Sequence, residues 1–478
     1  MAVLNPFSYL ERNAGDSPAG AFLISAERTI TNAEAFELTK KLAYEFRRLG
    51  VKPGDVVALD LPEVLGGVFT MAAFHEAAAS TILPTEAVQG AVRSFDWLFT
   101  SGEVGAPGES THVVRVDDRF IANVEQNPFG ISPRDFPSEL SHVRIVYSSG
   151  TTGRPKAIGY PLGMAEIQIQ DLAQGWGATV SLFGLGALQG FLQLYMQLKL
   201  GEPFLSAGGL EPDAAVELCA RQSVTTILGS PAQIAGVAAS LESQDRTLPG
   251  VRAVVVNGTV LPVVMSRRIS LVMPNSRVVN VYGATESGMI ALRPYPSDDP
   301  FDAGQLNPES RVEIVDEHDQ VVAAGVTGRI RAQHPHMVTE YLSDPLAANE
   351  SFHDGWFYPG DLGFIRPEDN GLTLIGRASD IINAGGVKID PIQLDLFALK
   401  QENVIDAASF SYRESDGLLA VGMALVTRDD IDVDALVSSL KAEFGPAAPR
   451  IVARVEAIPR TENGKPQRNI LAEKYSGG

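Results

Sequence analysis

Short apolar segments alternate with helical stretches along most of the chain, and this alternation limits the possible fold more than any other feature. Between residues 28 and 62, a helical segment is followed by a Pro-Gly-Asp turn at 53–55 and then by the apolar segment VVALDLP. Further apolar segments, VRIVYS, TTILGS and VRAVVVNG, are separated by helical stretches such as DAAVELCARQ. Short buried strands that alternate with helices predict a layered α/β sheet.

The chain of 478 residues is too long for one ordinary core, so we expect two to four domains or subdomains. Around residues 310–375 the sequence changes to short strands and turns, which predicts a small β-rich subdomain. Beyond Arg377 the pattern predicts a separate α+β unit, with helices near 391–400 and 433–445 and a last strand at RIVARVEAIP.

A flexible joint is predicted where the α+β unit begins. The segment SDIINAGG at 379–386 contains two adjacent glycines, a composition typical of a joint between domains. We therefore expect a domain boundary here, with one part of the chain over 1–378 and a separate C-terminal unit over 379–478.

Composition excludes several classes of partner. Lys and Arg total 38 against 58 Asp and Glu, and the formal net charge of −20 argues against general binding to nucleic acid or anionic membranes. The single cysteine, Cys219, excludes an internal disulfide and a cysteine-based zinc site, and it agrees with the reducing cytoplasm. The first twenty residues lack the basic and apolar regions of a signal peptide. A cytoplasmic enzyme is therefore expected.

An uncharged run at 172–198 is long enough to be compared with a membrane span. Gln189, Gln193 and Gln197 recur in it every four residues, and several glycines interrupt it. Glutamines at this spacing form one polar stripe on a helix, so we expect a buried helix with a polar edge and no membrane span.

The segment IVYSSGTTGRPKAIGY at 145–160 has the composition of a phosphate-binding loop. Its order differs from that of a Walker A loop, but Gly150 and Gly153 allow a tight turn whose N–H groups converge on an anion. The donors in this loop are Ser148, Ser149, Thr151, Thr152 and the cation Lys156. An ordinary Ser/Gly turn is the alternative interpretation of this segment taken alone.

Five segments together resemble, in the same order, the core motifs of the adenylate-forming superfamily, which includes acyl- and aryl-CoA ligases, peptide-synthetase adenylation domains and luciferases. The segments are SSGTTGRPK at 148–156, YGATESG at 282–288, WFYPGDLG at 356–363, GRASDIINAGGVKI at 376–389 and PRTENGKPQR at 459–468. The resemblance implies a large N-terminal domain over 1–378 and a small, mobile C-terminal domain over 379–478. It also implies an acid–CoA ligase-like enzyme that uses ATP to activate a carboxylate and then transfers the acyl group to a thiol.

The chemistry of adenylation suggests a role for each motif. A carboxylate attacks the α-phosphorus of ATP and expels pyrophosphate, so negative charge must be stabilised at two places. The 148–156 loop is expected to hold the β- and γ-phosphates, and Glu286 with Thr151 is expected to bind Mg²⁺, which prefers oxygen ligands. In the second motif, Tyr282 and Gly283 are expected at the adenine and Thr285 at the α-phosphate, while Gly258 forms the tight turn of the adenine site.

The resemblance also implies roles for residues in the last three motifs. Asp361 is expected to accept hydrogen bonds from the ribose hydroxyls, although Pro359 replaces the Thr that many relatives have nearby. Arg377 adds a second ribose or phosphate contact. Lys465 is expected to bridge the carboxylate and the α-phosphate during adenylation. Lys388 is expected either to meet a CoA phosphate or to be solvated.

The acid pocket is less well defined by the sequence. The region at 176–190 contains no acidic residue, and an unpaired buried ammonium would be costly, so an α-amino acid is disfavoured. An aromatic or medium-chain acid is expected instead. The predicted lining residues are Trp176, Phe183, Leu185, Gly229 and Gly258.

The acceptor thiol is expected to be that of CoA, with a discrete acyl-carrier protein as the alternative. No carrier domain follows Lys465 in this sequence. The compact chain favours a specialised biosynthetic enzyme, and a homodimer is left open. A non-catalytic nucleotide-binding relative is the alternative from a different functional class, to be separated by acid-dependent exchange of pyrophosphate into ATP.

Overall fold

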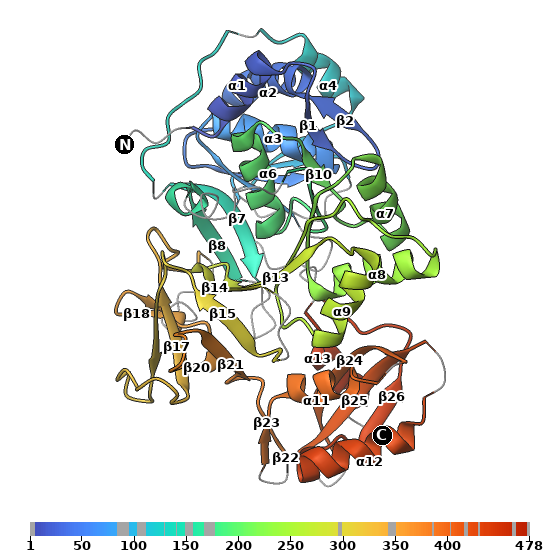
Figure 1. Ribbon diagram of the computed structural model, residues 1–478. Helices are drawn as coiled ribbons and strands as arrows, with labels where there is room; N and C mark the ends of the chain where they lie inside the picture. Colours follow the sequence, from blue (N-terminus) through green and yellow to red (C-terminus); the bar gives the residue numbers. More distant parts are fainter. Residues whose placement is uncertain are drawn as a thin grey trace.

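The computed structural model describes the chain in segments, and its elements divide into two mixed sheets with helices, followed by a C-terminal α+β unit (Figure 1). The described residues are 5–83, 95–102, 111–128, 130–139, 141–148, 156–166, 177–294, 299–342, 350–384, 387–401, 403–414, 419–428, 431–460 and 465–475.

The first sheet is mostly parallel. Its order is β6-β5-β3-β4-β7-β8, with parallel pairing from β6 to β7 and antiparallel pairing between β7 and β8. The strands are β3 (Val56–Asp60), β4 (Ala79–Ile82), β5 (Trp97–Thr100), β6 (His112–Arg115), β7 (His142–Ser148) and β8 (Lys156–Pro161). The predicted phosphate loop connects β7 to β8.

The second sheet has a parallel core and an antiparallel extension. Its order in the described residues is β18-β19-β17-β20-β21-β15-β14-β13-β12-β11-β9-β10-β1-β2, with β16 beside β17. The parallel strands are β13 (Arg277–Ala284), β12 (Ala253–Asn257), β11 (Thr226–Gly229), β9 (Thr179–Ser181), β10 (Phe204–Ser206) and β1 (Ala21–Ile24), and β2 (Thr29–Thr31) closes that end antiparallel.

The antiparallel extension corresponds to the predicted β-rich subdomain. Its strands are β14 (Gly288–Pro294), β15 (Asp302–Leu306), β16 (Arg311–Val315), β17 (Gly328–Gln333), β18 (Phe352–His353), β19 (Trp356–Phe357), β20 (Asp361–Ile365) and β21 (Leu372–Arg377). These strands are continuous with the second sheet, because β15 pairs with both β14 and β21.

Helices cover the sheets and enclose two large cores. One core lies among α1, α2, α3, α6 and the first sheet, and the other among α7, α8, α9 and the parallel part of the second sheet. The helices are α1 (Phe7–Asp16), α2 (Asn32–Leu49), α3 (Glu63–His75), α4 (Asp118–Glu125), α6 (Leu188–Leu200), α7 (Pro212–Arg221), α8 (Pro231–Ser243) and α9 (Val263–Val272). The predicted α/β fold class is confirmed.

The C-terminal unit has its own core, whose buried residues all lie between Ile382 and Leu471. It lies at the opposite end of the molecule from α1, α2 and α4 (Figure 1). Its elements are β22 (Ile382–Ala384), β23 (Val387–Ile389), α11 (Pro391–Ala398), β24 (Val404–Arg413), β25 (Leu419–Thr427), α12 (Val433–Phe444), the short 3₁₀ helix Gly445–Ala447, β26 (Ile451–Arg454) and α13 (Arg468–Tyr475). The strand predicted at RIVARVEAIP is therefore shorter than expected.

The helix predicted over the uncharged run 172–198 is corrected by the structure. Residues 172–176 lie outside the described residues, Thr179–Ser181 form β9, and helix α6 begins only at Leu188. A Cβ on Gly190 would lie 2.1 Å from the carbonyl oxygen of Gly184, so these glycines allow a close turn before the helix. A buried parallel strand is as apolar as a buried helix, and periodicity alone does not separate the two. No described helix is long and apolar enough to cross a membrane.

Candidate active site

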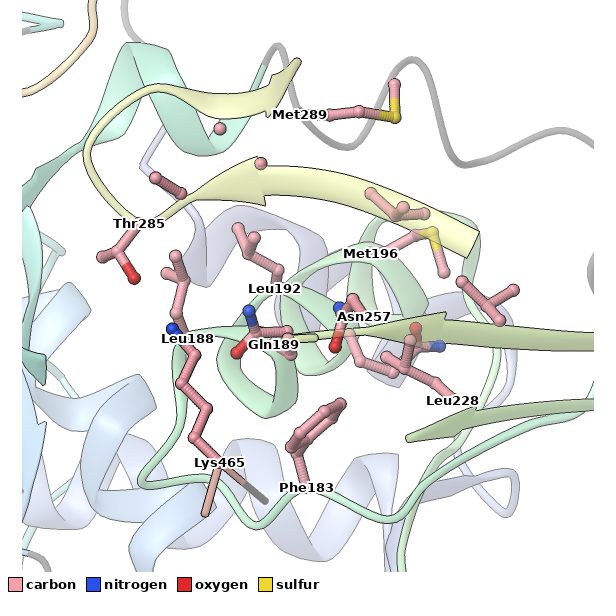
Figure 2. A pocket seen from close by; sticks show the side chains of 17 residues that line it. Phe183, Leu188, Gln189, Leu192, Met196, Leu228, Asn257, Thr285, Met289 and Lys465 are labelled. Atoms are coloured by element: carbon pink, nitrogen blue, oxygen red, sulfur yellow. The ribbon is translucent and has the colours of Figure 1, made fainter. Parts of the chain in front are cut away.

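A cavity of about 160 Å³ lies between α6, the ends of β11, β12 and β13, and Lys465 of the C-terminal unit. Figure 2 shows Thr285 and Lys465 at one end of this cavity and Leu228 at the other. Its lining residues are Phe183, Leu188, Gln189, Leu192, Gln193, Met196, Leu228, Val255, Asn257, Gly258, Val281, Gly283, Ala284, Thr285, Gly288, Met289 and Lys465. Among these described residues, Lys465 is the only charged one.

Three of the predicted nucleotide-binding residues form one hydrogen-bonded group. The Tyr282 hydroxyl donates to Oδ2 of Asp361 at 2.7 Å, and Nε of Arg377 lies 3.3 Å from Oδ1 of the same carboxylate. β20 and β21 pair Asp361 directly with Arg377, which explains the second contact. Burial raises the pKa of Asp361, whereas Arg377, Tyr282 and Lys465 oppose this rise.

Lys465 lies close enough to this group to interact with it electrostatically. Burial lowers the pKa of Lys465, and Arg377 lowers it further, whereas the nearby carboxylates of Asp361 and Glu286 raise it. The structure thus brings Lys465 together with residues more than eighty positions earlier in the sequence. In this arrangement the C-terminal unit delivers its lysine to the cavity.

The two ends of the Lys465 loop are fixed by buried or half-buried ion pairs. Arg460 contacts both oxygens of Asp406 on β24, at 2.6 and 2.8 Å, and Nη2 of Arg468 lies 2.7 Å from Asp395 on α11. The N–H of Gln467 also donates to the carbonyl of Pro459 at 2.8 Å. These contacts orient the base of the loop and so restrict the position of the lysine.

Glu286 is 8% exposed and lies beside the end of the predicted phosphate loop. The hydroxyl of Tyr341 donates to its Oε1 at 2.8 Å, and the ammonium of Lys156 lies 4.5 Å from the centre of the Tyr341 ring. Tyr341 therefore connects the loop lysine on β8 with the predicted magnesium ligand. No motif pointed to Tyr341, because it lies outside the five segments.

The loop before α6 is held by two charged residues, the buried Arg144 and the half-buried Glu63. The N–H of Leu185 donates to Oε1 of Glu63 at 2.9 Å, and Nη2 of Arg144 donates to the carbonyl of Leu185. Ser206 also donates to Oε1 of Glu63, at 2.6 Å. Both backbone groups of Leu185 are thereby satisfied by side chains, which fixes the loop that carries Phe183 into the cavity.

The predicted acid-pocket residues are only partly those that line the cavity. Phe183 and Gly258 line it, whereas Trp176 lies outside the described residues. Leu185 is instead packed into the core next to α3 and α6, and a Cβ on Gly229 would meet Leu182 and Ile234. Side chains alternate along β11, so Leu228 and not Gly229 faces the cavity.

Other predicted site residues have different outcomes. Thr285 and Gly283 line the cavity together with Lys465. Ser149, Gly150, Thr151, Thr152 and Gly153 lie outside the described residues, as does the side chain of Ser148. Lys388 is exposed on β23, opposite Asn383 of β22. The expected roles of all these residues remain predictions.

The functional residues that sequence reasoning missed are the polar groups of the pocket wall. Gln189 and Gln193 belong to the predicted polar helix edge and both line the cavity, whereas Gln197 of the same edge does not. Asn257 directly precedes Gly258 in the sequence, and no pattern in the sequence predicted a role for it. The four-residue spacing of Gln189 and Gln193 was the available signal for these two residues, but the spacing does not indicate that they line a cavity.

The charged groups present suit a magnesium–nucleotide complex. Lys465 and Arg377 supply positive charge for phosphates, and Asp361 supplies an acceptor for hydroxyl groups. In the part of the chain that the structure describes, no group of three or more His, Cys, Asp or Glu could hold a metal ion by itself. Magnesium shared with phosphate oxygens needs only one or two carboxylates, and Glu286 fits that role. When bound, the ion would neutralise phosphate charge.

Comparisons with known proteins agree with this arrangement. A family model described as AMP-binding enzyme matches residues 103–342. The oxalate–CoA ligase of Arabidopsis thaliana is 24% identical over 506 residues, an alignment that covers 95% of each chain. The chain therefore belongs to the family of AMP-binding enzymes. The resemblance to adenylate-forming enzymes and the prediction of an enzyme are confirmed.

Solved structures show the same fold. The anthranilate CoA ligase AuaEII, in complex with anthranoyl-AMP, matches with a TM-score of 0.88 and 17% identity over 100% of this chain and 98% of that chain. The O-succinylbenzoate coenzyme A synthetase MenE of Bacillus subtilis, in complex with ATP and a magnesium ion, matches with a TM-score of 0.82 and 20% identity over 96% and 98% of the two chains.

Proposed function

We propose that the protein is an AMP-forming acid–thiol ligase that activates a carboxylic acid with ATP and transfers the acyl group to CoA. The observation that carries this proposal is the meeting of Lys465 and Thr285 in one cavity, next to the carboxylates of Glu286 and Asp361. Relatives that align over nearly the whole chain are named as acid–CoA ligases, which supports the same activity here.

The arrangement suggests how the first half-reaction proceeds. An acid in the cavity has its carboxylate at the end where Lys465 and Thr285 lie, and the α-phosphate of ATP approaches the same end. The Lys465 ammonium reduces the repulsion between these two anions as the carboxylate oxygen attacks phosphorus. Pyrophosphate leaves toward Lys156 and the loop between β7 and β8, and the product is an acyl-adenylate.

In the second half-reaction the thiol sulfur attacks the acyl carbon and AMP departs. The C-terminal unit then needs a different orientation relative to the rest of the chain, because Lys465 fills one end of the cavity. The proposal places Lys388, which is exposed on β23, at the CoA phosphates. It includes a domain boundary at 378/379 and a cytoplasmic location, the latter supported by the single buried cysteine, Cys219.

The cavity favours aromatic or medium-chain acids over α-amino acids. Its described lining contains no carboxylate that could pair with an ammonium group, and most of its wall is apolar.

The test is to incubate the full-length protein with ATP, Mg²⁺, CoA and a panel of carboxylic acids, and to detect AMP and acyl-CoA by mass spectrometry. We expect both products with at least one acid, and no acyl-CoA when CoA is omitted. Absence of AMP with every acid would contradict the proposal. Accumulation of acyl-AMP in the presence of CoA, with acylation of an added carrier protein, would support the carrier as acceptor.

A further inference from the structure

Two side-chain amides on the cavity wall have a buried polar atom without a hydrogen-bond partner in the described part of the chain. Gln193 on α6 is 3% exposed, and its Nε2 has no acceptor. Asn257, the last residue of β12, has a buried Oδ1 with no donor. Both residues line the cavity that contains Thr285 and Lys465. Such groups are uncommon in folded proteins, because burial removes their hydrogen bonds to water.

The size of the cavity limits the body of the acid. Its volume of about 160 Å³ is close to the ~150 Å³ of an engineered apolar cavity that binds benzene. Phe183, Leu192, Met196 and Leu228 supply apolar surface around the two amides. One six-membered ring, or a branched chain of similar volume, fits this space.

We propose that the acid carries a neutral hydroxyl group on a body of about one six-membered ring, and that Gln193 and Asn257 recognise this hydroxyl. The inference rests on the proposed function. A hydroxyl both accepts and donates, so it can accept from Nε2 of Gln193 and donate to Oδ1 of Asn257. Each side-chain amide contains a donor and an acceptor, and rotation of the amide exchanges their positions. A hydroxyl can form a hydrogen bond with the amide in either position.

Other polar substituents match these amides less well. A second carboxylate would require a cation, and among the described lining residues only Lys465 is charged, at the end that the reacting carboxylate occupies. An ammonium group would require an acidic partner, which the described lining lacks. An unsubstituted acid would leave both amide atoms unpaired.

The hydroxyl is placed away from the reacting carboxylate. Figure 2 shows Asn257 between the end formed by Thr285 and Lys465 and the apolar end at Leu228. Gln193 lies on α6 one turn after Gln189, which the same view shows in the middle of the cavity. The amides are therefore available to select the substituent without taking part in the chemistry.

The test compares matched acids with the full-length protein by measuring kcat/KM for acyl-CoA formation. The pairs are benzoate with its three monohydroxy derivatives and cyclohexanecarboxylate with its hydroxy derivatives, and 2-naphthoate tests the size limit. We expect the best hydroxylated acid to exceed its parent by at least ~10-fold, because a site built for a hydroxyl rejects the analogue that lacks it. Equal or better use of the parents, or preference for naphthoate, would overturn the inference while leaving the ligase activity established.

Substitution then identifies the residue responsible. Gln193→Met should reduce the hydroxyl preference, measured as the ratio of kcat/KM for the hydroxylated acid to that for its parent, at least ~10-fold, because the unpaired donor is removed. Gln197→Met is the matched control, since Gln197 is on the same helix and 1% exposed but does not line the cavity. Gln197→Met should keep the wild-type preference for the hydroxylated acid over its parent.

An unchanged preference in Gln193→Met would contradict the assigned role. Should that variant fail to fold, the ratio measured for the wild-type protein still decides whether a hydroxyl is selected. If none of these acids gives AMP or acyl-CoA while another acid of the broad panel does, this inference is wrong and the proposed function stands. If no acid of the whole panel gives AMP, the proposed function is wrong as well.

Discussion

Lys465 and Asp361 are oppositely charged groups that share a buried environment, and this environment shifts their pKa values in opposite directions. Burial lowers the pKa of Lys465 and raises that of Asp361, since it disfavours the charged form of both. Their mutual attraction opposes both effects. The site therefore contains a lysine whose charge is sensitive to alkaline pH and to the neighbouring Arg377.

The first prediction concerns this sensitivity. Because the protonated ammonium is the form that reduces repulsion between the two anions, adenylation should be lost as pH rises through the lowered pKa of Lys465. We expect kcat/KM for ATP to fall on the alkaline side at a pH below the ordinary lysine pKa, and Lys465→Arg to move this fall to higher pH. Pyrophosphate exchange measured from pH 6 to 11 provides the profile.

The control for this profile is Lys474→Arg, at an exposed position on α13. That variant should keep the wild-type alkaline limb. If kcat/KM falls at the same alkaline pH in Lys465→Arg as in the wild-type protein, a group other than Lys465 controls the fall.

Asp390 gives a second prediction, about stability. Its Oδ1 accepts from the N–H of Ile392 at the start of α11, while Oδ2 is buried with no partner among the described residues. Burial raises the pKa of Asp390 to about 6. The folded state therefore holds its proton more tightly than the unfolded state, and the free energy of unfolding falls as pH rises from about 4 to about 6.

Asp390→Asn keeps an acceptor for Ile392 but removes the buried charge. The quantity to compare is the unfolding free energy of the variant minus that of the wild-type protein. We expect this difference to be about 1 kcal/mol larger at pH 8 than at pH 5. Urea unfolding at the two pH values measures the difference. The same relative stability at both values would mean that Asp390 does not titrate in this range.

At the level of elements, the loop between β9 and α6 depends on residues from three other parts of the chain. Glu63 at the start of α3 and Arg144 on β7 hold the two backbone groups of Leu185, and Ser206 on β10 supports Glu63. The pocket wall at Phe183 is thus positioned by charged side chains that do not themselves line the cavity.

The third prediction tests this positioning role. Glu63→Leu should raise KM for the acid about 10-fold or more and change KM for ATP little, because a small displacement of the wall weakens acid positioning. Glu63→Gln retains an acceptor oxygen for Leu185 and should restore most of the acid affinity. Steady-state kinetics with each substrate varied in turn make the comparison. Equal increases in both KM values would indicate general disruption.

Local signals predicted many elements but not their contacts. The helix α2 follows from a strong periodic pattern within 31–50, and the strand β7 follows from the apolar segment VRIVYS. By contrast, the uncharged run at 172–198 contained both a buried strand and a helix, and a loop in which Gly184 packs against Gly190 separates them.

The candidate site was predicted where a motif names a residue and missed where the fold brings residues together. Lys465, Thr285, Asp361 and Glu286 lie near one another as the five motifs implied. Tyr341 and Asn257 were not assigned roles, because their importance comes from contacts across the fold. Leu185 was expected at the pocket because apolar composition does not distinguish a core residue from a lining residue.

At the level of the whole molecule, an ion pair connects the C-terminal unit to the rest of the chain. Arg428, after β25, lies 2.6 Å from Oε2 of Glu242 on α8, and Arg268 on α9 contacts both oxygens of the same carboxylate. Both arginines lower the pKa of Glu242. This contact favours the orientation in which Lys465 reaches the cavity.

The fourth prediction concerns that orientation. Arg428→Ala should lower the adenylation rate about 2- to 5-fold at low salt, consistent with the ~1 kcal/mol or less that an exposed ion pair contributes. Because salt screens the pair, the difference from the wild-type protein should shrink at 0.5 M NaCl. Arg221→Ala, at an exposed position ending α7, is the charge-matched control. A deficit in Arg428→Ala that is independent of salt would argue against an electrostatic contact.

The arrangement of Lys465 at the cavity gives the most direct test of the proposed ligase activity. The measurement is acid-dependent exchange of labelled pyrophosphate into ATP by the wild-type protein and by Lys465→Ala, using an acid identified in the panel. We predict exchange in the wild-type protein and a loss of at least ~100-fold in the variant, since the cation that stabilises the meeting of two anions is removed. Equal exchange rates in the two proteins would contradict the assigned role of Lys465, and no exchange with any acid would contradict the activity itself.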